Sequence, residues 1–100
     1  MTALSWLSDS DALDLLRVSD DNAGIVDALV ASLPAYVEVT TGYPKDLVSS
    51  EQCDEVVRQM CRVTLQLWYN PDGTDAPQLS AIADSLAKTV RAMSGDAGRS

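Results

Sequence analysis

Residues 21–41, DNAGIVDALVASLPAYVEVTT, decide the predicted fold because their apolar side chains recur at the period of an α-helix. At 100° per residue, an arc of about 140° collects eight side chains that we expect to face a core: Ile25, Val26, Leu29, Val30, Leu33, Tyr36, Val37 and Thr40. Asp27 and Glu38 lie opposite. Between these faces runs a ridge of small side chains, Ala28, Ala31, Ser32 and Ala35. The ridge allows close approach of another helix, from this chain or from a neighbouring subunit.

Pro34 is the anomaly in this helix, because it lacks the N–H that would bond to the carbonyl of Val30. We expect a kink there, on a polar face where water replaces the missing donor. Gly42 is the expected terminator of the helix.

A third helix is predicted after Ser49 or Ser50, which would cap it. Its expected buried stripe is Cys53, Val56, Val57, Met60, Cys61, Thr64, Leu67 and Trp68, widened by Val63 and Leu65. Its expected solvent face is Glu55, Arg58, Arg62 and Gln66. Because the apolar arc is so wide, we expect this helix to be central and packed on more than one side. The pair Trp68-Tyr69 at its end is either packed against the last helix or a recognition pair.

The other elements complete an all-α fold, a small bundle of about four helices in one domain of residues 1–100. A short leading helix is capped by Ser8, and the last helix runs from Ala76 or Gln78 to Met93. Residues 42–50 are expected to form a loop with a short extended piece at Leu47-Val48. We expect flexible termini, an N-terminal arm (1–7) and a C-terminal tail (94–100).

The composition excludes most catalytic chemistry. The chain has no histidine, so it offers no imidazole base or ligand. Cys53 and Cys61 are interpreted as buried apolar residues, and no spacing predicts a metal or cofactor site. We found no apolar run near the length of a membrane span and no signal peptide, so we expect a soluble protein that is intracellular or assembled inside a cell.

The acidic balance argues against binding of nucleic acid. Fifteen acidic and seven basic residues leave a net charge of −8, without the basic clusters that phosphate binding needs. The amino-terminal acids fit helix capping better than a calcium loop, because their spacing departs from that of an EF-hand. A role for their field in meeting a basic partner stays open.

Four short motifs resemble the small head–tail connector proteins (adaptor or head-completion proteins) of tailed bacteriophages. They are LRVSDD at 16–21, YVEVTTG at 36–42, LWYN at 67–70 and the end of the last helix near Arg91. The likeness spans roughly residues 10–93, and Pro34 departs from the unbroken helix of that family.

The resemblance implies a non-enzymatic structural subunit without a cofactor. Copies would form a closed, dodecameric ring below the portal protein, at the head–tail junction of the virion, after assembly in the host cytoplasm. The ring would extend the DNA channel and join a downstream tail or stopper protein, with DNA passing without specific binding and no membrane involved. Contacts are expected at residues 42–50, 70–77 and 94–100.

The candidate interaction residues are Trp6, Tyr43, Lys45, Asp46, Asp72, Asp75, Arg91 and Arg99. Trp6 lies outside any helical stripe, so it is either a core plug or an anchor for a partner. The alternative function is a free-standing acidic inhibitor or DNA mimic that occupies a basic cleft. Such a mimic needs carboxylates spaced along one exposed strip. A small metal-dependent enzyme is a third reading, and no recognisable site supports it.

Overall fold

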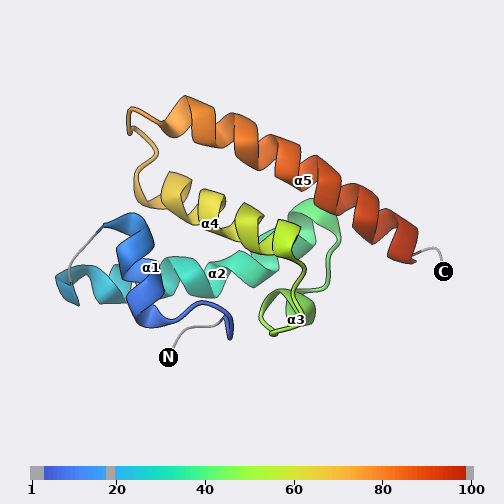
Figure 1. Ribbon diagram of the computed structural model, residues 1–100, viewed down its shortest axis with the longest axis horizontal. Helices are drawn as coiled ribbons and strands as arrows, with labels where there is room; N and C mark the ends of the chain where they lie inside the picture. The colour runs from blue at the N-terminus through green and yellow to red at the C-terminus, as the bar shows by residue number, and fades with distance from the viewer. Residues whose placement is uncertain (1–3, 18–19, 99–100) are drawn as a thin grey trace.

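The computed structural model describes residues 4–17 and 20–98 and is all-helical over that part of the chain (Figure 1). Its elements are α1 (Asp9–Leu16), a 3-10 turn η1 (Asp20–Asn22), α2 (Ala23–Thr41), α3 (Lys45–Val48), α4 (Glu55–Tyr69) and α5 (Ala76–Gly98). The predicted all-α class is confirmed, with five α-helices where about four were expected.

The molecule is a thin slab of 45 × 30 × 18 Å. In the view down its shortest axis, α4 lies between α2 and α5 (Figure 1). Helix α4 packs most extensively against α5 and also contacts α2 and α1. The prediction that this helix is central is therefore confirmed.

Two helix ends form as the sequence predicts. The Ser8 hydroxyl oxygen accepts a hydrogen bond from the Asp11 N–H at 3.1 Å and caps α1. Gly42 adopts φ 85°, and its N–H donates to the Glu38 carbonyl at 2.8 Å. Residues with a side chain are strained at such a φ, so glycine is the residue that ends α2 without cost.

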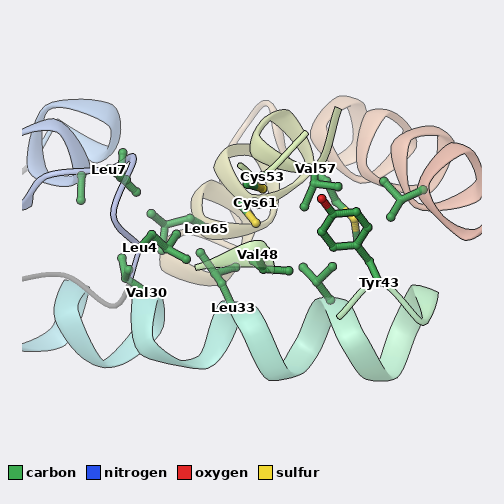
Figure 2. Packing of buried hydrophobic residues seen from close by; sticks show 14 of the residues in the cluster. Leu4, Leu7, Val30, Leu33, Tyr43, Val48, Cys53, Val57, Cys61 and Leu65 are labelled. Carbon is green, nitrogen blue, oxygen red and sulfur yellow. The ribbon is translucent and has the colours of Figure 1, made fainter. Parts of the chain in front are cut away.

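The core forms where one side of α2 meets α4 and the segments before them (Figure 2). Its fully buried side chains on α2 are Val26, Val30, Leu33 and Val37, and on α4 they are Val57, Met60, Cys61 and Leu65. Ile25 and Tyr36 were expected in this core but are 58% and 39% exposed. The covering elements reach only the centre of the predicted arc, so its edge remains in solvent.

The start of α4 was predicted too early. Residues 45–48 form α3 instead of an extended piece, and α4 begins at Glu55 with Asp54 as its N-cap. Pro44 precedes α3, where its missing N–H costs no hydrogen bond, and the Lys45 N–H donates to Glu38 Oε2 at 3.0 Å. This hydrogen bond satisfies a free N–H at the start of α3, and apolar periodicity in the sequence does not reveal it.

Residues 4–7 and 94–98 fall within the arms that were expected at 1–7 and 94–100, and the structure places them against the core and in α5, while residues 1–3 and 99–100 lie outside the described residues. Leu4 and Leu7 are buried, and the Ser5 N–H donates to the Ser49 carbonyl at 3.0 Å, so residues 4–7 belong to the body of the protein. At the other end α5 continues to Gly98, five residues beyond the predicted end at Met93. Extending a formed helix by one residue adds a hydrogen bond at little cost, so neither Gly95 nor Ser94 stops it.

We expect the two sides of α2 to differ sharply in their effect on stability. Leu33→Ala opens a cavity in the core and should lower the free energy of unfolding by about 2–5 kcal/mol. Val39→Ala, at a position 87% exposed, should change it by no more than about 0.5 kcal/mol. Urea denaturation followed by circular dichroism measures both. Equal effects of the two substitutions would contradict the burial described here.

Candidate interaction surface

Trp6 contacts two helices, α3 and α4. Its indole Nε1–H donates to the Val48 carbonyl at 2.8 Å, and its ring lies 5.6 Å from the Arg58 guanidinium and 5.4 Å from that of Arg62. These arginines were expected on a solvent face, but they are half-buried over the indole. Trp6 therefore fixes the N-terminal segment to α3 and α4 through one hydrogen bond and two cation–π contacts.

Arg58 connects Trp6 to the turn that precedes α4. Its Nε donates to the Cys53 carbonyl at 3.0 Å and its Nη2 to the Glu51 carbonyl at 2.6 Å. Those two carbonyls belong to the turn before α4, which has no helical partners for them. The guanidinium thus satisfies backbone acceptors while it covers Trp6.

Tyr43 is buried beside the amino-terminal end of α4 (Figure 2). Its hydroxyl donates to Asp54 Oδ2 and accepts from the Asp54 N–H, both at 3.3 Å, while its own N–H donates to Thr41 Oγ1. Burial raises the pKa of this hydroxyl above its ordinary value. The side chain supports the loop between α2 and α4 from within.

The charged candidate residues lie at separate places. Lys45 and Asp46 are exposed on α3, whereas Asp72 and Asp75 are exposed in the turn after α4. The 15 residues of α4 separate these two groups, which is about 22 Å of helix. The structure does not bring them together. Arg99 lies outside the described residues.

Arg91 joins α5 to the carboxyl-terminal end of α2. Its Nε and Nη2 both donate to the Thr40 carbonyl, at 3.3 and 3.1 Å. That carbonyl belongs to the last turn of α2 and has no partner within the helix, so a cation there is favourable. Beside this contact, a hollow of about 240 Å³ opens between α2, α4 and α5 and includes Tyr36 and Lys88 in its lining.

The outer face of α2 is the feature that the predicted site residues missed. It comprises seven exposed and uncharged residues: Gly24, Ile25, Ala28, Ala31, Ser32, Ala35 and Val39. The ridge of small side chains seen in the sequence forms its middle, and no helix within residues 4–17 and 20–98 covers it. Asp27 and Glu38, the only charged residues of α2, border it on one flank.

The uncovered area of α2 is large for so apolar a helix. By length and composition residues 23–41 could cross a membrane, so the expectation that no segment qualifies was wrong, although a core helix passes the same test. Yet only 22% of that stretch is buried inside the protein. The outer face is therefore apolar surface that the described part of the chain leaves uncovered, and contiguous surface of this kind is typical of interaction sites.

The thiols provide no reactive centre. Burial raises the pKa of Cys53 to about 11 and that of Cys61 to about 12. At pH 8 a thiol of pKa 11 is ionised to about one part in a thousand, and the thiolate is the reactive form. Among the described residues, no group of three or more His, Cys, Asp or Glu side chains could hold a metal ion.

Comparisons with protein-family models, with curated proteins and with solved structures find no match to this chain. The likeness to phage connector proteins therefore rests on the four sequence motifs alone and stays a prediction. The other arguments about function come from the exposed face of α2, the burial of the thiols and the net charge of the chain.

We expect a thiol-specific disulfide reagent at pH 8 to leave Cys53 and Cys61 unmodified in the folded chain and to modify both after unfolding in guanidinium. The reason is their burial and the raised pKa of each thiol. Val39→Cys is the matched control, because a thiol at that exposed position should react within the first minutes. Rapid modification of either natural thiol in the folded protein would contradict the packing around α4.

Proposed function

We propose that this chain is a non-enzymatic assembly subunit, and that the assembly is the head–tail connector of a tailed bacteriophage. In this proposal copies form a closed ring below the portal protein, extend the DNA channel and join the head to a tail or stopper protein. The observation that carries the proposal is the uncovered outer face of α2. A small protein gains nothing from leaving such a face in water unless another molecule covers it.

The absence of histidine from the sequence and the burial of both thiols support a role without catalysis. The groups with strongly raised pKa values are the thiols of Cys53 and Cys61, which burial holds in the neutral form. They do not line a hollow together with a base or nucleophile among the described residues. The residues are therefore used for packing, as a structural subunit requires.

The charge of the chain supports a channel through which DNA passes without being held. A net charge of −8 repels the phosphate backbone, and Arg58 and Arg62, the paired basic residues of α4, are engaged with Trp6. The same acidic charge is compatible with a DNA mimic. A mimic acts as a free monomer on a basic partner, whereas a connector subunit must associate with copies of itself.

Mixing the purified chain with its cognate portal protein tests this proposal. We expect light scattering to show a complex of defined mass and electron microscopy to show a ring on one end of the portal. Ala35→Glu places a charge in the outer face of α2 and should abolish the complex while the helical signal is retained. Gln59→Glu, at an exposed position on α4, is the control that should assemble normally.

Two outcomes would contradict the proposal. One is the absence of any complex between the chain and the portal at every ratio. The other is tight binding of the monomer to a basic DNA-binding protein, competitive with DNA, which would favour the acidic inhibitor.

A further inference from the structure

Two helices of the protein each have an exposed face. In Figure 1, α4 lies between α2 and α5, and both outer helices have exposed residues at helical spacing. On α5, four exposed residues recur at spacings of four, three and four and form what we term the α5 ridge: Ala81, Ser85, Lys88 and Ala92. The same spacing relates Gly24, Ala28, Ala31 and Ala35 on α2. Apart from Lys88, the side chains at these positions are small, and small side chains let two helix backbones come close.

The partner of the α2 face is constrained by charge. In a symmetric pair of antiparallel α2 helices, a two-fold axis near Ser32 would bring Asp27 of one copy beside Glu38 of the other. The contact would place four carboxylates along one flank of the interface. Like charges at this distance repel, so an α2–α2 pair is disfavoured.

A membrane surface is disfavoured for related reasons. Helices that lie on bilayers have cationic flanks and large apolar side chains, because they meet anionic headgroups and acyl chains. The flank of this face is acidic, and most of its residues are alanine, glycine or serine.

The α5 ridge has the opposite charge on its flank. Lys88 is exposed and forms no ion pair with another described residue. Arg91, which also donates to the Thr40 carbonyl of its own chain, lies three residues further along the same side, and the exposed Asp84 lies four residues before Lys88. These three residues give the flank a net charge of +1, against −2 for the flank of α2.

The charged flanks of α2 and α5 lie on the same side of their contact face when each helix is viewed along its own direction. When two such helices face each other antiparallel, these flanks lie on the same side of the contact. When the helices run parallel, the flanks lie on opposite sides. An antiparallel arrangement therefore brings Asp27 of one copy next to Lys88 of another.

We propose that the outer face of α2 in one copy docks antiparallel on the α5 ridge of a second copy, with Asp27 paired to Lys88 across the contact. The inference rests on the proposed function, because it names the neighbour within the ring. A contact between two different faces is heterologous, and such contacts close into rings when the rotation between neighbours is suitable.

The size of the contact explains why the ring would need a template. A 19-residue helix is about 28 Å long, and a single pair of helices of that length buries less than the roughly 1,200 Å² at the lower limit of stable interfaces. Association in solution is therefore weak, and ring closure on a portal strengthens it by adding a second contact to each subunit.

Cross-linking tests the geometry directly. The variants Ala31→Cys and Ser85→Cys are prepared separately, mixed and mildly oxidised. The natural thiols of Cys53 and Cys61 are buried, so we expect only the introduced thiols to react. We expect a disulfide-linked dimer in the mixture and none from either variant alone. A dimer from Ala31→Cys alone would show an α2–α2 pair and overturn the proposal, as would no dimer at any concentration.

Charge reversal tests the pairing. Sedimentation at about 0.05 M salt, where screening is weak, should show that Lys88→Glu and Asp27→Lys each raise the dissociation constant of self-association about three- to tenfold. The double variant, carrying both reversals in one chain, should return to within about twofold of the wild type. Asp72→Lys makes the same charge change in the turn after α4 and is the control. No recovery in the double variant would overturn the pairing.

The outcomes separate this contact from the proposed function. Failure of both tests in a chain that still forms rings on the portal overturns the α2–α5 contact and leaves the connector function standing. Cross-linking in a chain that never joins a portal keeps the contact and overturns the connector. Binding to anionic phospholipid vesicles that blocks the cross-link would assign the α2 face to a membrane and overturn the contact.

Discussion

Burial of one side of α2 against α4 is the constraint on which the rest of the structure depends. Leu33 and Val37 fill the interior between the two helices, and Figure 2 shows Val48 and Cys61 directed into the same region from α3 and α4. The N-terminal segment closes this interior at one end through Leu4. Because α5 packs mainly against α4, the position of α5 also depends on the α2–α4 packing.

The same constraint leaves α2 with two different sides. Helices α1, α3, α4 and α5 contact α2, and its residues Gly24, Ala28, Ala31 and Ala35 remain exposed. The outer face retains Ile25 and Val39 in solvent and keeps its two acids on one flank. A helix shared between a core and an open surface suits a subunit that folds alone and assembles later, and this is the physical basis of the proposed connector role.

The sequence predicts those parts of the fold that depend on local chemistry. The Ser8 cap, the Gly42 terminator and the central place of α4 follow from hydrogen bonding and apolar spacing along single segments. Contacts between segments that are distant in the chain could not be predicted from the sequence. Periodicity cannot show which part of an apolar arc is covered, so Ile25 was placed in the core. The indole of Trp6 meets Val48 across 42 residues, and no local pattern encodes such a contact.

Methyl NMR of the valines on α2 tests the central claim most directly. A soluble paramagnetic reagent should broaden the Val39 methyl signals of the isolated chain and leave those of Val37 sharp, because only Val39 is in solvent. On assembly with the portal, the Val39 signals should become protected as well. Protection of Val39 in the isolated monomer, or its continued broadening within the ring, would contradict the account.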